Sequence, residues 1–318
     1  MVKLLYIIAV DTNYQLKIPL MHNLFYKKSI IFLLLGISVN AYCQKATDSA
    51  TVDTVKTSST KKSSFKIGAD YLNNNVFMGR TGLATTPLIS PDIKYTFKPG
   101  IYISGDMDIL PDNKKNKLDG GNLTAGYDFD ITDDFFGGLS YSKMFYNPNS
   151  TLIGSSITNT FSADFDYEIG DIVTPSVSAN YSLNSGANAD IFINAGISHD
   201  FILIKPFANN DDFIISPTAT VNLGTQNFYD AYIKKKVFKS KKVGTAVATF
   251  EANLSKFETL DYEFSVPLEY KIGHLMLEFI PTYAIVQNGF KSAAVAKAVG
   301  LSNNTSVFYF ETGLSLKF

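Results

Sequence analysis

The sequence predicts an all-β fold: a transmembrane antiparallel up-and-down β-barrel of about 12 strands, with short periplasmic turns and long extracellular loops. Three observations indicate this fold. From Phe65 onward, apolar and polar residues alternate with a period of two along one segment after another. Short and long connections between these segments alternate along the chain. The last segment alternates as well and ends on an aromatic residue, Phe318.

The N-terminal region reads as a leader followed by a polar tail. Residues 1–43 form the expected signal peptide, in which Lys27 and Lys28 precede the apolar segment Ser29–Val39. We expect Met21 to be the true start and cleavage to follow Cys43, although lipidation of Cys43 is the alternative. Residues 44–64 contain no aromatic residue and are rich in Ser, Thr and Lys, which predicts a disordered periplasmic tail. Residues 65–318 then form the outer-membrane β-barrel.

The first half of the barrel shows clear alternation in each predicted strand. Phe65, Ile67, Ala69 and Tyr71 share one face of the first strand, and Lys98-Pro99-Gly100 makes the first tight turn. Thr132-Asp133-Asp134 and Gly170-Asp171 mark the next two short turns. The strands expected in this half are Phe65–Leu72, Asp92–Phe97, Ile101–Ile109, Asn122–Asp130, Phe135–Phe145, Thr158–Glu168 and Ile172–Ser182.

The second half continues the pattern up to the C-terminus, with a further tight turn at Ile272-Gly273-His274. Its expected strands are Ala189–Asp200, Asp212–Gly224, Glu258–Lys271, Leu275–Val286 and Ser306–Phe318. Ala246–Phe257 also alternates, but counting it would give an odd total and place the C-terminus outside the cell. We therefore assign it to a long extracellular loop.

Long connections are expected on one side of the membrane and short ones on the other. The long loops are Asn73–Ser90, Leu110–Gly121, Asn147–Ile157, Thr225–Phe257 and Gln287–Thr305. Within the last loop, Phe290–Val299 has the composition of a short helix. Proline lacks the N–H that a strand donates, so we predict β-bulges where prolines interrupt strands, at Pro91, Pro175, Pro217, Pro267 and Pro281.

Composition is consistent with a membrane barrel and gives no sign of a nucleic-acid partner. Hydrophobic residues make up 46% of the chain, yet no segment after the leader has the ~18 consecutive apolar residues of a spanning helix. Only alternate residues of a barrel strand meet lipid, so modest hydropathy is expected. The formal net charge is −1, whereas nucleic-acid binding favours a basic surface. A soluble β-sandwich would also alternate, but it does not require the aromatic C-terminal strand.

The terminal strand Ser306–Phe318 presents one apolar face and one polar face. A terminal pattern of this kind resembles the signal that the barrel-assembly machinery of bacterial outer membranes reads. The candidate assembly signal consists of Phe310, Leu314, Leu316 and Phe318. This places the chain in the outer membrane of a Gram-negative cell, with that machinery, outer-membrane lipid and lipopolysaccharide as expected partners. The oligomeric state is not indicated.

The sequence offers little support for an enzyme. Of three histidines, His22 lies in the leader, and His199 and His274 fall at the periplasmic ends of strands, away from the outer rim. Neither stands beside a candidate nucleophile, so we predict no catalytic residues. The pairs Asp128/Asp130 and Asp211/Asp212 lack the glycine and bidentate glutamate of a calcium loop, and we expect no metal or other cofactor.

Charged residues are concentrated on the face that should line the lumen. The candidate pore-lining residues are Asp106, Asp108, Asp128, Asp164, Asp166, Glu263, Glu269, Glu278, Glu311 and Lys94. One interpretation is an acidic wall that favours cations. The other is that acids and bases pair across the lumen and fill it, and 12 strands lie between packed and open barrels. The basic run Lys234–Lys242 in the longest loop either binds lipopolysaccharide phosphates or is simply solvated.

Five motifs together resemble an uncharacterised, porin-like outer-membrane β-barrel family of Bacteroidota. They are Asp70–Arg80 (DYLNNNVFMGR), Gly224–Tyr229 (GTQNFY), Leu260–Pro267 (LDYEFSVP), Pro281–Ile285 (PTYAI) and the ending SVFYFETGLSLKF. The resemblance covers most of Phe65–Phe318 and transfers no catalytic residue. The expected function is a porin-like channel for small polar or cationic solutes. The alternative is a plugged barrel with a structural, adhesion or partner-binding role, recognisable by loops packed into the lumen.

Overall fold

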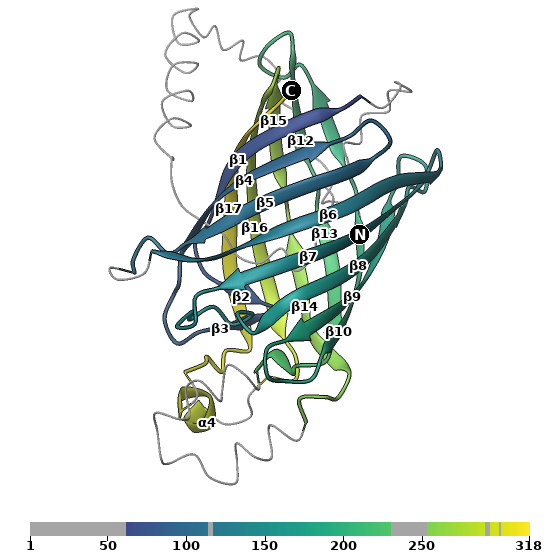
Figure 1. Ribbon diagram of the computed structural model, residues 1–318. Helices are drawn as coiled ribbons and strands as arrows, with labels where there is room; N and C mark the ends of the chain where they lie inside the picture. Colours follow the sequence, from purple (N-terminus) through teal and green to yellow (C-terminus); the bar gives the residue numbers. More distant parts are fainter. Residues whose placement is uncertain (1–61, 114–116, 230–252, 290–292, 299) are drawn as a thin grey trace, which may run out of the picture. The chain divides into compact units, whose positions relative to one another are not determined.

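The computed structural model describes residues 62–113, 117–229, 253–289, 293–298 and 300–318 (Figure 1). The expected leader, most of the polar tail, part of Ala246–Phe257 and the basic run Lys234–Lys242 lie outside these residues. Among the described residues, no helix combines the length and apolar character needed to cross a membrane.

The described residues form a closed antiparallel β-barrel of 12 strands, as the alternation predicts. Three of these strands are each interrupted and carry two labels. In chain order the barrel strands are β1 Ser64–Leu72, β4 Leu88–Thr96, β5 Ile101–Ile109, β6 Leu118–Thr132, β7 Phe135–Tyr146, β8 Ile157–Tyr167, β9 Thr174–Asn184, β10 Asp190–Ser198 with β11 Phe201–Ile204, β12 Asp211–Ile215 with β13 Thr218–Gly224, β14 Glu258–Ser265 with β15 Leu268–Ile272, β16 Leu275–Val286 and β17 Ser306–Lys317.

The C-terminal strand closes the barrel. β17 pairs with β16 along its length, from Leu275↔Leu316 to Ile285↔Ser306. On its other side it pairs with the first strand, from Lys66↔Lys317 to Leu72↔Glu311. Every other barrel strand also has a neighbour on each side, apart from the short extension β11. Closure therefore satisfies backbone donors and acceptors without leaving a long open edge.

The two faces of the wall differ as the period of two requires. Outward side chains are large, apolar and 40–58% exposed, and they occur all round the barrel: Ile67, Ile93, Ile103, Met107, Leu123, Leu139, Phe161, Val177, Ile197, Phe264, Phe279 and Leu314. Their sequence neighbours on the inner face are mostly Ser, Thr, Asn, Asp and Glu. An apolar outside and a polar inside are the reverse of a soluble β-sandwich, whose apolar side chains face inward.

The two ends of the barrel also differ. Five short connections and both ends of the barrel sequence, at Ser64 and Lys317, lie at what we call the turn end. Six connections lie at the opposite, loop end, together with the hairpin strands β2 Val76–Phe77 and β3 Arg80–Thr81 and the helix α4 Ala293–Ala298 (Figure 1). The expected helix within Phe290–Val299 is confirmed over Ala293–Ala298. β4 and β6 begin at Leu88 and Leu118, earlier than predicted, so Ser90 and Gly121 belong to strands rather than to loops.

The predicted bulges at the prolines are wrong. The register is unchanged across Pro217 and Pro267, because Ser198↔Thr218 and Phe201↔Ile215 continue one ladder and Thr218↔Ser265 and Ile215↔Leu268 another. Pro91, Pro175 and Pro281 pair in register with Ala69, Ile197 and Phe310. The register shifts fall elsewhere, near Ile109, Ile131, Thr158 and Leu223.

At three of these prolines, the residue pair that contains the proline makes one backbone hydrogen bond, where an ordinary pair makes two. The carbonyls of Pro217, Pro267 and Pro281 accept bonds from the N–H groups of His199 (3.3 Å), Ser216 (2.9 Å) and Val266 (3.2 Å). A hydrogen-bonded antiparallel pair exchanges two such bonds, but proline has no N–H to return the second. The residue pairs before and after each proline fix the register. Three neighbouring strand pairings therefore each lack one backbone hydrogen bond, and none of them forms a bulge.

Restoring one of these bonds should stabilise the barrel. In Pro281→Val the new N–H can reach the carbonyl of Val266, and the valine side chain points outward among apolar neighbours. We expect the free energy of unfolding to rise by about 0.5–1.5 kcal/mol, the net value of one hydrogen bond. The measurement is urea unfolding of the micelle-folded barrel, followed by its heat-modifiable gel mobility. Ile285→Val, an outward position of the same strand that already has its N–H, is the control and should not gain stability.

Candidate functional site

All ten candidate pore-lining residues lie on the inner face of the barrel, because each is in register with inward neighbours and alternates with exposed apolar residues. Several are brought together across strands. Glu269 stands directly opposite Glu278, and Asp106 stands opposite Asn122. Glu263 accepts a hydrogen bond from the hydroxyl of Tyr309 at 3.0 Å. The inner wall is therefore polar and carries many carboxylates.

Several inward aspartates lie against the wall, over glycines of neighbouring strands. A Cβ atom built on Gly68 or Gly138 would come within 2.5 Å of a carboxylate oxygen of the aspartate opposite. The absence of a side chain on the glycine is what lets the carboxylate fold over the strand. These cross-strand pairs are Gly68 with Asp92, Gly138 with Asp164 and Gly313 with Asp70. The carboxylates thus add charge to the inner surface while projecting little into the lumen.

Lys94 is held on the same wall by an aromatic ring and a carboxylate. Its Nζ lies 3.9 Å from the centre of the Tyr102 ring and 3.8 Å from Oδ2 of Asp128. Tyr102 lies flat in turn because Gly126 leaves room beneath its ring. The side chains of Lys94 and Asp128 keep 32% and 44% of their surface exposed, so this ion pair faces open space rather than a packed core. A second pair joins Lys271 to Glu269 at 3.1 Å.

The loop end is filled by an apolar cluster that we call the cap. Its members are buried residues contributed by the loops 73–87, 147–156, 225–257 and 287–305 and by the ends of three strands: Phe77, Met78, Ile153, Ile157, Phe192, Phe228, Tyr229, Leu254, Leu260 and Leu301. Phe77 packs edge-on against Phe228, with ring centres 4.7 Å apart, and against Phe192 at 5.7 Å. Such pairs contribute beyond simple area burial.

The cap spans the width of the barrel. Phe77 belongs to the loop that follows β1, whereas Phe192 lies on β10. Around the ring these strands are separated by five ladders in one direction and seven in the other, so they stand on nearly opposite walls. The loop 73–87 therefore crosses the lumen to bury Phe77. A second cluster of Leu88, Leu110 and Leu152 adds to the closure on the β4 side.

Arg80 ties the loops of the cap together. It is the only arginine among the chain's 28 basic residues, and only 5% of its surface is exposed. Nη1 donates to the carbonyls of Met78, at 2.6 Å, and of Leu260. Nη2 donates to Oε1 of Gln226 at 3.1 Å and to the carbonyl of Gln287 at 2.7 Å. One guanidinium thus joins three loops and β14, which suits its rigid, planar arrangement of donors.

Burial and nearby side chains act in opposite directions on the charge of Arg80. Burial lowers its pKa, because the ionised form loses hydration, while the nearby Tyr229, Asp261 and Glu258 act in the opposite direction. An arginine keeps its proton even then, so a permanent positive charge lies at the boundary between the cap and the acidic wall.

Asp190 fixes a second part of the cap. Its carboxylate is fully buried and accepts four hydrogen bonds. The donors are the hydroxyl of Thr225 (2.6 Å), the backbone N–H groups of Asn227 (2.7 Å) and Phe228 (2.7 Å), and the amide of Asn184 (2.6 Å). These bonds hold the turn that carries Phe228 and Tyr229 into the cluster, so the aromatic core of the cap rests on one buried carboxylate.

The prediction from sequence did not identify Arg80, Asp190 or the cap. Three of the motifs behind the family resemblance meet here: Phe77 and Arg80 come from Asp70–Arg80, Phe228 and Tyr229 from Gly224–Tyr229, and Leu260 from Leu260–Pro267. The one feature of the sequence that could have identified this site is Arg80, the single arginine of the chain, which lies in the predicted outer loop Asn73–Ser90.

Of the two histidines in the described residues, only His274 lies at the turn end, between β15 and β16. The expected position of His199 at the end of a strand is wrong, because the strand continues beyond it as β11 to Ile204. Nδ1 of His274 is 2.6 Å from the carbonyl of Lys317, and its ring stacks on Phe318. His199 packs edge-on against Phe201, with ring centres 4.4 Å apart. Within the described ranges, no three His, Cys, Asp or Glu residues gather in a way that could hold a metal ion.

No family model and no curated protein matches the sequence. Solved structures similar to the chain include "KdgM porin", with 10% identity over 80% of this chain and 99% of that one and a TM-score of 0.41. The NanC porin has 9% identity over 80% and 100% of the chains, with a TM-score of 0.42. LpxR from Salmonella typhimurium has 10% identity over 79% and 99%, with a TM-score of 0.40.

Replacing Arg80 by lysine should open the cap. Lysine keeps the charge but cannot serve four separated acceptors, and buried acceptors without donors cost about 1–3 kcal/mol each. Phe77, Phe228 and Tyr229 are at most 2% exposed in the intact cap. We therefore expect chymotrypsin to cleave the Arg80→Lys barrel at these residues while sparing the wild type. Lys297→Met, which removes an exposed charge at the same end, is the control. Equal protection of all three proteins would show that Arg80 does not hold the cap.

Proposed function

We propose that this protein is an outer-membrane β-barrel of a Gram-negative bacterium, a porin-like channel for small polar or cationic solutes. We also propose that the cap closes its outer mouth in the described conformation and must move for solutes to pass. The observation that carries the proposal is the inner wall, where acidic side chains and a half-exposed ion pair, Lys94–Asp128, face open space below the cap.

The outer surface supports the membrane part of the proposal. Apolar side chains exposed all round the barrel would meet lipid tails, and aromatic residues gather toward both ends, as membrane interfaces favour. Tyr95, Phe97, Tyr127 and Tyr167 lie toward the turn end, and Tyr181, Tyr283 and Phe308 toward the loop end. Phe310, Leu314, Leu316 and Phe318 would serve as the assembly signal. The porin-like family of Bacteroidota remains the group we expect.

The charge of the wall supports the preference for cations. Asp106 lies on the inner face of β5, and Asp164 and Asp166 lie on the inner face of β8. Rings of carboxylates along a water-filled passage attract cations and exclude anions. The polar surface between them, rich in Ser, Thr and Asn, would allow small hydrated solutes to pass without strong binding.

A second candidate is a permanently plugged barrel with a structural, adhesion or partner-binding role. The observation that favours it is the cap itself, because loops from opposite walls are packed together with native-like burial. In this case the outer loops would carry the function and the lumen would only be filled. Neither candidate includes catalysis, since His199 lies in the wall beside the outward Phe201 and His274 lies in the turn between β15 and β16.

Ion selectivity tests the acidic wall. The chain from Gln44 onward, folded into a planar bilayer under a salt gradient, should give a reversal potential of the sign for cation preference. Neutralising Asp106, Asp164 and Asp166 together to asparagine should move the potential toward zero, because the wall then attracts fewer cations. Asp171→Asn, at an exposed position of the turn between β8 and β9, is the matched control. A reversal potential unchanged by the triple substitution would contradict the role of the wall.

A disulfide across the cap tests whether the cap is a gate. Gly82 and Leu301 form an antiparallel bridge between two outer loops. Such a pair places the Cα atoms about 4.5–5.5 Å apart, within the range that a disulfide spans. In a chain starting at Gln44, the double variant Gly82→Cys/Leu301→Cys would contain no other cysteine. We expect the oxidised barrel to be silent and the reduced barrel to conduct.

The reduced double variant and the two single variants are the controls for this experiment. A barrel that stays silent in both redox states, and in the wild type, would favour the plugged barrel over the channel. Conductance that is the same in both redox states would show that these loops do not gate the passage.

A further inference from the structure

We propose that the groove between the outer loops 73–87 and 287–305 is a binding site for a hydroxyl-rich, negatively charged saccharide. The groove lies at the loop end, on the side of the cap that faces away from the lumen. The proposal does not depend on whether the barrel conducts, since the site is complete when the cap is closed.

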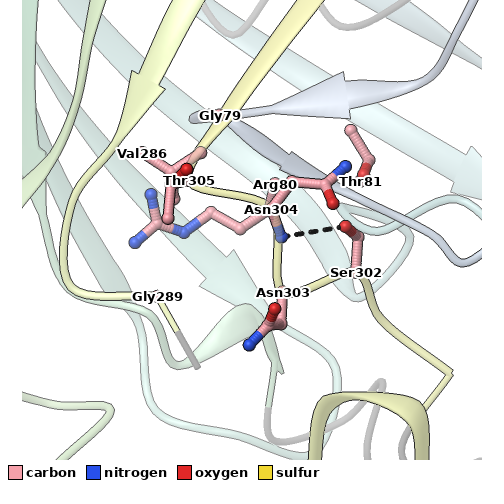
Figure 2. A pocket seen from close by; sticks show the side chains of 9 residues that line it. All are labelled: Gly79, Arg80, Thr81, Val286, Gly289, Ser302, Asn303, Asn304 and Thr305. Carbon is pink, nitrogen blue, oxygen red and sulfur yellow. Dashed lines mark hydrogen bonds between the residues drawn. The ribbon is translucent and has the colours of Figure 1, made fainter. Parts of the chain in front are cut away.

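The groove consists of two adjoining cavities. The larger has a volume of about 380 Å³ and the smaller about 100 Å³, and they share four lining residues: Thr81, Ser302, Asn303 and Asn304. Figure 2 shows the smaller cavity, with Gly79, Arg80 and Thr81 from one loop and Ser302, Asn303 and Asn304 from the other. Together they fall within the size range of small-molecule sites.

Backbone hydrogen bonds hold the two walls of the groove together. Gly82 and Leu301 form the antiparallel bridge, and the N–H of Ser302 donates to the carbonyl of Thr81 at 3.0 Å. On the far wall, the N–H of Thr86 donates to Oδ1 of Asn74 at 3.0 Å. Leu301, which is only 1% exposed, packs in the cap and so attaches the loop 287–305 to it. A groove fixed in this way would lose little conformational entropy when a ligand binds.

The lining has the chemistry that recognises sugar hydroxyls. Amide and hydroxyl side chains dominate it, namely those of Asn74, Thr81, Thr85, Ser302, Asn303 and Asn304. An amide offers donors and acceptors at once, and a hydroxyl offers both on one atom, so each can pair with a sugar hydroxyl in either role. Leu83, which is 58% exposed, adds an apolar edge against which the C–H face of a sugar ring can rest.

The charges of the groove select an anionic ligand. Among the described residues, its lining includes no Asp or Glu, in contrast to the lumen, and the cations in it are Arg80 and Lys297. Both η nitrogens of Arg80 are occupied by four acceptors of the cap. The exposed Lys297, on α4, is therefore the cation that would meet a carboxylate or phosphate of the ligand. A hydrogen bond to a charged group is stronger than one between neutral groups.

Titration calorimetry on the detergent-folded barrel tests the proposal. The probes are short glucose oligomers and the same oligomers oxidised to the 6-carboxylates, with purified lipopolysaccharide and inorganic phosphate as further arms. We expect the carboxylated oligomers to bind more tightly than the neutral ones. Lys297→Gln should reduce that preference by about tenfold, the effect of one charge-assisted hydrogen bond. Lys256→Gln, an exposed lysine of another outer loop, is the control and should leave it unchanged.

A second variant keeps the test independent of charge. Thr85→Trp fills the exposed side of the groove without touching the cap core, so it should abolish binding of every oligomer while chymotrypsin protection of Phe77 stays intact. Stronger binding of lipopolysaccharide than of free oligomers would identify a lipid-borne saccharide as the source. Failure of all saccharides to bind, or equal effects of Lys297→Gln and Lys256→Gln, would overturn the proposal. Conductance of the same preparation, measured separately, decides the channel function on its own.

Discussion

Closure of the sheet through β17 is the constraint on which the rest of the structure depends. Because β17 pairs with both β1 and β16, all barrel strands share one ring of hydrogen bonds, and the register of each is fixed by two neighbours. A shift by one residue would turn every apolar side chain inward. Closure therefore decides which residues face out, which acidic residues face in, and at which end the long loops gather.

The same constraint explains why the prolines are tolerated and why predicting bulges from them failed. A proline in an open sheet can bend or slip the strand, since one side is free to adjust. Here Pro217, Pro267 and Pro281 lie between neighbours held in register above and below, so each removes one hydrogen bond and shifts nothing. The local sequence shows that a proline lacks the N–H donor. Whether the strand register shifts in response depends on the closure of the barrel.

Sequence alone was sufficient for the features that repeat with a short period. The alternation located 12 strands, and the turn signals located four of the five short connections. The strand extension β11 and the connection 205–210 after it were not predicted. The cap has no such period, because Phe77 and Phe192 meet across the lumen and are separated by more than a hundred residues along the chain. Arg80 was equally hidden, since three of its four acceptors come from three other segments, and only its status as the single arginine distinguished it.

The charged side chains along the barrel axis are mainly acidic on the wall below the cap and basic in the groove above it. The cap lies between these two regions. Below the cap the wall carries carboxylates such as Asp106 and Asp164, whereas the described residues that line the groove above it include Lys297 and no acid. Arg80 stands between the two, buried and permanently charged. If the proposed channel function is correct, a cation that enters from the loop end passes this charge before it reaches the acidic wall. Arg80 holds together the side chains that fill the mouth. Moving the cap would therefore remove the packed side chains and the buried charge from the passage at the same time.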